Sequence, residues 1–307
     1  MPEPLVSVII PTHNRKELLL NAVKSVLAQT YPTYEIIIVD DYGNADIALK
    51  EYVDVVRIIR IPHTPYPAEA RNIGLEHAFG KYIAFLDDDD TWLPEKLSYQ
   101  IEVLEKNPDI GLVCSNAYLY PSDDNNALLI TWNVKNEHDM LNQEILRDFV
   151  IQSTSVIRSS LLEYTGNFYA GADLLIGEDY DLSARFAAIS RIYYDPRPFI
   201  RYYINPKSIQ DRQSQSYVRY FRGVLTVMYR LKKFLREHQR LSFTSRIYLF
   251  YRIHDTKCDI ILNRILYEHN SCNMNDIIRL IFQYFYLFPF GVPKVIKYIL
   301  KSIYKGI

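Results

Sequence analysis

Four consecutive aspartates, Asp87, Asp88, Asp89 and Asp90, directly follow a short apolar run at residues 82–86 (YIAFL). A short, apolar and partly aromatic run without glycine or proline is typical of a buried strand. Four adjacent like charges raise one another's pKa, so at the end of a core strand they favour a bound cation. A solvated acidic turn is the alternative interpretation of such a run. The segments around it decide between the two.

Apolar runs alternate with amphipathic segments through the first two thirds of the chain. Pro67 suits the first turn of a helix at residues 68–78. Asn14 and Glu17 have the spacing of a capping box before the first helix. This alternation predicts an α/β fold with a doubly wound, mostly parallel, Rossmann-like sheet covered on both faces. The strands are expected at residues 5–10, 35–39, 53–61, 82–86, 111–118 and 156–157, and further helices at 18–27, 46–52, 94–104 and 178–186.

Carboxylates recur where strands or loops end. Asp40 with Asp41, the run 87–90, and Glu178 with Asp179 form three such groups. In open α/β sheets the carboxyl ends of the strands are where ligands bind. The sequence has no G-x-G-x-x-G turn after its first strand, no P-loop motif and no G-x-S-x-G elbow, which argues against a dehydrogenase, a P-loop kinase and an α/β-hydrolase. Carboxylates with a nearby arginine suit a diphosphate held through a divalent metal.

Five segments in order resemble glycosyltransferase family 2: SVIIPTHNR, QTYPTYEIIIVDD, ARNIG, KYIAFLDDDDTWLPEKL and GEDYDLSAR. The resemblance covers roughly residues 5–205 and implies an inverting, nucleotide-sugar-dependent transferase with the GT-A fold. It implies a nucleotide-sugar-binding half at residues 1–110 and an acceptor-binding half at 111–210. One segment departs from the family pattern, since Tyr203 and Asn205 stand where an arginine and a histidine are common.

The resemblance also implies roles for single residues. The nucleotide sugar is expected to contact Pro11, Thr12, Asn14, Asp40 (at the base), Arg71 (at the pyrophosphate), Asp87 and Asp88 (near the ribose). Without the resemblance, these residues are interpreted as a strand stop, turn caps and a surface ion pair. Asp87 and Asp89 match the DXD metal pair, with Asp89 the direct ligand of Mn²⁺ or Mg²⁺.

Asp179 matches the catalytic base, with Glu178 the second candidate and Asp181 the third. Acidic residues in the first turn of a helix are also stabilising without any catalytic role. As the base, Asp179 takes the proton of an acceptor hydroxyl, which then attacks the anomeric carbon in a single displacement. The metal neutralises charge on the departing nucleoside diphosphate.

The last hundred residues differ in composition from the rest. Residues 206–307 hold 18 of the 35 Lys and Arg but only 6 of the 36 Asp and Glu. Four aromatic, basic helices are expected at residues 217–238, 243–267, 276–288 and 294–304 in a helical extension (211–307). Such helices suit an anionic membrane surface and a polyprenyl-diphosphate-linked acceptor. The alternative is packing on the catalytic domain or, in a homo-oligomer, on a second subunit.

Other features bear on location and on competing functions. Three dispersed cysteines, no signal-peptide pattern and no long apolar run favour a cytoplasmic protein, peripheral on the inner face of the cell membrane. A UDP-sugar is the preferred donor, and a glycan or lipid-linked sugar the acceptor. No nucleic-acid-binding motif is present. A catalytically silent nucleotide-sugar-binding scaffold and a sugar nucleotidyltransferase are the alternative functions.

Overall fold

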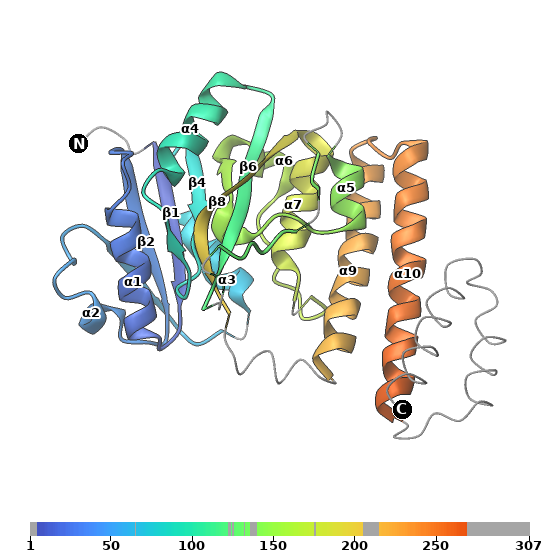
Figure 1. The fold of residues 1–307 in the computed structure, drawn as a ribbon, viewed down its shortest axis with the longest axis horizontal. Coiled ribbons are helices and arrows are strands. Elements are labelled where there is room, and N and C mark those ends of the chain that lie inside the picture. Colours follow the sequence, from blue (N-terminus) through green and yellow to red (C-terminus); the bar gives the residue numbers. More distant parts are fainter. Residues whose placement is uncertain are drawn as a thin grey trace. The chain divides into compact units, whose positions relative to one another are not determined.

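The computed structural model describes residues 5–64, 66–121, 124, 126–131, 133–135, 140–174, 176–204 and 215–268. The chain divides into two compact units, of residues 1–172 with 178–205 and of residues 173–177 with 206–307. The first unit holds the sheet, and the second holds two long helices (Figure 1). The division of the first 210 residues into donor and acceptor halves stays a prediction.

Eight strands in the described part of the chain form one sheet, in the order β3-β2-β1-β4-β7-β6-β8-β5. Strands β3, β2, β1 and β4 are parallel neighbours, as are β6 and β8, whereas β7 is antiparallel to β4 and β6, and β5 to β8. The expected α/β fold with a mostly parallel sheet is confirmed. The bounds are β1 Val6–Thr12, β2 Tyr34–Asp41, β3 Arg57–Ile61, β4 Tyr82–Phe85, β5 Thr91–Trp92, β6 Ile110–Tyr120, β7 Val156–Arg158 and β8 Arg191–Tyr203.

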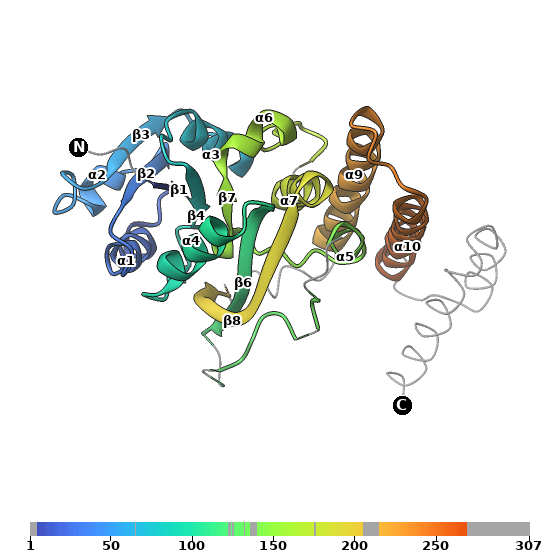
Figure 2. The ribbon, with the colours of Figure 1, turned by 90° about the horizontal axis from the view of Figure 1, so that it is seen from above.

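Helices cover both faces of the sheet. Figure 2 shows α1 and α4 on one face and α3 and α6 on the other. Short 3-10 turns flank β7 at Gln152–Thr154 (η1) and Ser159–Leu161 (η2). The helices of the first unit are α1 Lys16–Leu27, α2 Ala45–Ala48, α3 Pro67–Glu76, α4 Lys96–Lys106, α5 Leu141–Leu146, α6 Leu162–Thr165 and α7 Glu178–Ile189.

The alternation of side chains along β2 builds both layers of the core. Ile36 and Ile38 are buried in the cluster that includes the apolar face of α1, whereas Ile37 and Val39 are buried with Ala70 of α3. Successive strand residues point to opposite faces of a sheet, so one apolar strand packs against helices on both sides. By the same rule, Asp40 and Asp41 at the end of β2 point to opposite faces of the sheet.

Strand β8 was not predicted. Its pattern is interrupted by Pro196 and Pro198, which cannot donate to a ladder and are confined to edges and bulges. The pairing with β6 jumps from Ser115–Asp195 to Asn116–Pro198, so β8 bulges where the prolines lie. The third strand is also shorter than expected, since Val53 and Val55 are exposed and β3 begins at Arg57.

The predicted capping box at Asn14 is wrong. Helix α1 begins at Lys16 with Arg15 as its N-cap residue, and no side chain caps it. Asn14 has φ of 53°, in the left-handed region that asparagine tolerates better than most residues. Asn14 therefore lies in a sharp turn between β1 and α1.

The second unit contains α9 (Gln215–Glu237) and α10 (Phe243–Glu268), which confirms the first two of the four expected C-terminal helices. The other two, at residues 276–288 and 294–304, lie outside the described residues. Among the residues that are described, no helix combines the length and the apolar composition that crossing a bilayer requires.

Candidate active site

A pocket of about 410 Å³ opens in the first unit where β1, β2 and β4 end. It unites segments that are far apart in the sequence. Of the residues expected to bind donor or metal, Pro11, Thr12, Arg71, Asp87, Asp88 and Asp89 line it, and Asn14 and Asp40 do not. The remaining lining residues are His13, Arg15, Asp41, His63, Thr64, Tyr66, Pro67 and Ala70.

The four aspartates after β4 have different partners. Thr12 Oγ1 donates to Asp88 Oδ2 at 2.7 Å, and Arg15 Nη1 donates to Asp88 Oδ1 at 3.0 Å and to Asp89 Oδ2 at 2.8 Å. Asp90 is almost fully buried, and its Oδ1 accepts a 2.8 Å hydrogen bond from the backbone nitrogen of Tyr203. The first three therefore face the pocket, whereas Asp90 ties the turn to β8.

Burial and mutual repulsion perturb these acids. Burial and, after it, the nearby charge of Asp87 raise the pKa of Asp89 to about 6. Burial likewise raises the pKa of Asp88 above its ordinary value. Crowded carboxylates of this kind fit a divalent cation, since it would offset their like charges.

Arg71 connects two of the three carboxylate groups. Its buried guanidinium donates from Nη2 to Asp87 Oδ1 at 2.7 Å and from Nη1 to Glu178 Oε1 at 2.8 Å. The centroid of the Phe168 ring lies 5.6 Å from the Arg71 guanidinium carbon. Burial acts to lower the pKa of Arg71, but the negative charges of Asp87 and Glu178 outweigh it and raise that pKa. Helix α3 beside the pocket and the first turn of α7 are thereby joined through the Arg71 guanidinium.

The three candidate bases on α7 are distinguished by their contacts. Glu178 is paired with Arg71, and Asp181 forms a buried 2.6 Å ion pair with Arg185. Asp179 accepts a 2.8 Å hydrogen bond from the backbone nitrogen of Tyr180. Burial and, after it, the charge of Glu178 raise the pKa of Asp179 to about 6, although Arg71 opposes the rise. Asp179 does not line this pocket itself, but its charge acts on Arg71.

Asp41, rather than Asp40, faces the pocket. Asp40 Oδ2 accepts a 3.0 Å hydrogen bond from the backbone nitrogen of Ala45, and only 1% of Asp40 is exposed. Asp41 accepts from the backbone nitrogen of Thr64 at 2.9 Å, and its Oδ2 lies 3.0 Å from Nδ1 of His63. Because neighbouring strand residues point to opposite faces, only one of the two can face the α3 side, where the pocket lies. This alternation could have identified Asp41.

Two groups of side chains could hold a metal. Asp87 and Asp89 offer carboxylate oxygens, the ligands that Mg²⁺ prefers. His13, Asp41 and His63 offer ligand atoms that lie within 4.8 Å of one another, and imidazole suits transition metals. No sequence pattern pointed to His63, which lies in a loop, or to Arg15 as a partner of two aspartates.

Ser153 holds the turn that carries the aspartates through hydrogen bonds. Ser153 Oγ accepts a hydrogen bond from the backbone nitrogen of Asp87 at 3.1 Å, and its carbonyl accepts one from Trp92 Nε1 at 2.8 Å. The ammonium of Lys96 is buried 4.0 Å from the Trp92 ring centroid and donates to Gln100 Oε1. Burial lowers the pKa of Lys96 well below its ordinary value. The tryptophan and lysine after the aspartates therefore have a structural role.

Much of the first unit matches known proteins in sequence. The sequence profile of glycosyl transferase family 2 matches residues 7–166. The putative teichuronic acid biosynthesis glycosyltransferase TuaG of Bacillus subtilis is 42% identical over 108 residues, which are 33% of this chain and 42% of TuaG. WfgD of Escherichia coli, a UDP-Glc:alpha-D-GlcNAc-diphosphoundecaprenol beta-1,3-glucosyltransferase, is 34% identical over 132 residues, which are 42% of this chain and 51% of WfgD. The chain thus spans about half the length, or less, of these relatives.

A solved structure shows the same fold. The mannosyltransferase PcManGT of Pyrobaculum calidifontis, in complex with GDP-Man and Mn²⁺, superimposes with a TM-score of 0.59 at 16% identity. The match covers 99% of this chain and 88% of that one. This likeness confirms the GT-A type of fold predicted from the sequence.

Proposed function

Because the chain belongs to glycosyltransferase family 2, we propose that it transfers a sugar from a nucleotide-diphospho-sugar to an acceptor hydroxyl, with inversion at the anomeric carbon. One observation carries this proposal. A single pocket at the ends of β1, β2 and β4 gathers a buried arginine and several carboxylates, and a further carboxyl of raised pKa lies next to that arginine's partner. These are the groups that a diphosphate leaving group and an attacking hydroxyl require.

The donor fits the pocket in one direction. The diphosphate belongs at Arg71, whose guanidinium can donate charge-assisted hydrogen bonds to phosphate. The aspartates repel phosphate and would hold it only through the divalent metal. The nucleobase of the donor then belongs at the opposite side of the pocket, with Asp41, His13 and His63. A carboxylate accepts the imide hydrogen of uracil, so we keep a UDP-sugar as the preferred donor and move the base contact from Asp40 to Asp41. The donor of the relative WfgD is also a UDP-sugar.

A divalent metal fits the aspartates. Asp87 and Asp89 would hold Mn²⁺ or Mg²⁺, for which hard carboxylate oxygens are suitable ligands. When bound, the ion supplies charge neutralisation for the nucleoside diphosphate. Arg15 now bonds Asp89 and would have to share or release that carboxylate. The structural neighbour PcManGT was solved with Mn²⁺.

A carboxylate of the chain removes the proton from the acceptor hydroxyl. Asp179 takes it from the acceptor hydroxyl, and a pKa near 6 leaves this carboxyl ionised at neutral pH yet more basic than an ordinary aspartate. Arg71 holds Glu178 and Asp87 in place through its two ion pairs. A single displacement gives inversion and requires no covalent intermediate.

The acceptor proposal rests on relatives. WfgD acts on a diphosphoundecaprenol-linked sugar, and TuaG is assigned to teichuronic acid biosynthesis. We therefore place the protein in bacterial surface polysaccharide assembly, acting on a polyprenyl-diphosphate-linked glycan. Such an acceptor would make it a peripheral protein on the inner face of the cell membrane.

Thermal unfolding tests the donor site. UDP-, GDP-, dTDP- and CMP-sugars are screened with and without Mn²⁺, and we expect a UDP-sugar to raise Tm only with the metal. A ligand at about 100 times its Kd adds about 2.7 kcal/mol of stability, which is readily detected. If no nucleotide sugar changes Tm under either condition, the proposed function is wrong.

The neighbouring aspartates of β2 form a matched pair for the same screen. Asp41→Ala should remove most of the rise in Tm that the donor causes, because it deletes the pocket carboxylate. Asp40→Ala should preserve that rise while lowering the free energy of unfolding by about 1 kcal/mol, the usual cost of deleting a side chain that caps backbone nitrogens. If Asp40→Ala instead removes the rise in Tm and Asp41→Ala preserves it, the contact to the nucleobase belongs to Asp40.

A further inference from the structure

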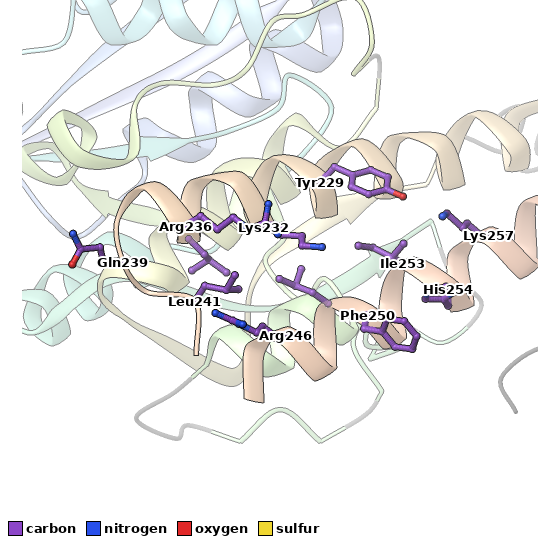
Figure 3. A pocket seen from close by; sticks show the side chains of 12 residues that line it. Tyr229, Lys232, Arg236, Gln239, Leu241, Arg246, Phe250, Ile253, His254 and Lys257 are labelled. Carbon is purple, nitrogen blue, oxygen red and sulfur yellow. The ribbon is translucent and has the colours of Figure 1, made fainter. Parts of the chain in front are cut away.

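A groove of about 760 Å³ lies between α9 and α10 of the second unit. Figure 3 shows Lys232 and Arg236 on one of its walls and Arg246 and Lys257 on the other. None of the described residues that line the groove is an Asp or a Glu. A volume of this size suits a small ligand or a headgroup rather than a folded partner.

The cations around the groove face one another without a lining carboxylate. Lys257 Nζ lies 5.9 Å from the ring centroid of Tyr229, and burial together with the charge of Lys257 lowers the pKa of His254. Like charges gathered in this way repel, and an anion in the groove would offset them. Charge complementarity therefore points to an anionic occupant.

The floor of the groove is apolar. Leu235, Leu249 and Ile253 line it, and each is buried. A purely inorganic anion would gain nothing from aliphatic side chains, whereas an amphiphile would bury apolar surface there. The occupant that matches both walls and floor is an anion attached to a hydrocarbon.

An exposed apolar stripe adjoins the groove on α10. Phe243, Ile247, Phe250 and Tyr251 recur at helical spacing, and between 38% and 78% of each is exposed. Phe250 belongs to both the stripe and the groove lining. A helix with an apolar face beside Lys and Arg is typical of proteins that lie in the headgroup layer of a membrane.

We propose that the groove between α9 and α10 binds the phosphate-bearing headgroup of an anionic membrane lipid, while the α10 stripe enters the adjoining acyl boundary. Lys232, Arg236, Arg246 and Lys257 bind the phosphate, and the aliphatic floor covers the first part of the lipid chain. This site is independent of the proposed sugar transfer, because it uses no residue of the donor pocket.

Vesicle flotation of the full chain tests the proposal. Vesicles of phosphatidylglycerol with phosphatidylcholine should bind the protein at low salt, and pure phosphatidylcholine vesicles should not. The groove variant Lys232→Gln/Arg236→Gln/Arg246→Gln/Lys257→Gln should bind at least about tenfold more weakly. A control variant of equal charge change should bind like wild type: Arg219→Gln/Arg222→Gln/Lys233→Gln/Arg240→Gln, on exposed residues outside the groove.

Each remaining outcome overturns the proposal. Equal losses in both variants would show general electrostatic attraction, and equal binding to neutral vesicles would show an apolar surface only. Release by millimolar glycerol phosphate would identify a site for free anions rather than for a lipid. If the fourfold groove variant does not fold, Arg236→Gln/Arg246→Gln, which changes only exposed side chains, should still weaken binding.

Discussion

We expect Asp179→Asn to lower kcat by about 10²- to 10⁴-fold, the usual contribution of a general base. The amide keeps the size of the side chain and can still accept from the Tyr180 backbone nitrogen, but it cannot take a proton. Donor affinity should stay near the wild-type value, because Asp179 does not line the donor pocket. Steady-state kinetics together with donor titration would separate the two effects.

Glu178→Gln is the matched control for that substitution. Glu178 is the neighbour in sequence and is paired with Arg71, so removing its charge should reduce kcat much less than removing that of Asp179. If the two variants lose equal activity, or if only the Glu178 variant loses it, the base has been assigned to the wrong residue.

The pKa of Asp179 adds two pH effects. The base works ionised, so kcat/KM should fall as pH falls through about 6 and should flatten in the Asp179→Asn variant. The folded-state pKa lies above the ordinary 3.8, so the carboxyl destabilises the fold above about pH 6, and this penalty is absent below about pH 4. At neutral pH the inactive variant should therefore be more stable than wild type, and that result would exclude misfolding as the cause of its inactivity.

Arg71→Met should destabilise the protein by about 3–5 kcal/mol and abolish donor binding. The arginine is buried between Asp87 and Glu178, so its removal leaves two carboxylates without their shared cation. Arg71→Lys should recover only part of the loss, because an ammonium lacks the planar fork that reaches both acids. Chemical denaturation measures the stability, and donor titration measures the binding.

An exposed ion pair provides the comparison for Arg71. Lys106 pairs with Glu102 on the surface of α4, where such pairs contribute about 0.3–0.5 kcal/mol. Lys106→Met should therefore lower the free energy of unfolding only slightly. Similar small costs for both variants would mean that Arg71 does not hold the site together.

The sequence predicted the fold well where hydrophobic periodicity was uninterrupted. β1, β2, β4 and β6 are each built around an apolar run, and most of their residues are buried. It failed at β8, because Pro196 and Pro198 break the strand pattern and only the bulged pairing with β6 accommodates them.

Only part of the site could be predicted from the sequence. The family resemblance identified Arg71 and the aspartates after β4, and the structure brings these residues together. The family resemblance assigned the nucleotide's base to Asp40, although strand alternation separates the faces of Asp40 and Asp41. His63 comes from a loop whose position depends on tertiary packing, so no local pattern could place it.

Product analysis tests most directly whether the pocket catalyses sugar transfer. The nucleotide sugar selected by the thermal screen is incubated with a polyprenyl-diphosphate-linked sugar and Mn²⁺, and the products are followed by phosphorus and proton NMR. We expect one nucleoside diphosphate for each new glycosidic bond, with the anomeric configuration inverted relative to the donor. Diphosphate release from a nucleoside triphosphate would instead identify a nucleotidyltransferase, and donor binding without any transfer would identify a silent scaffold.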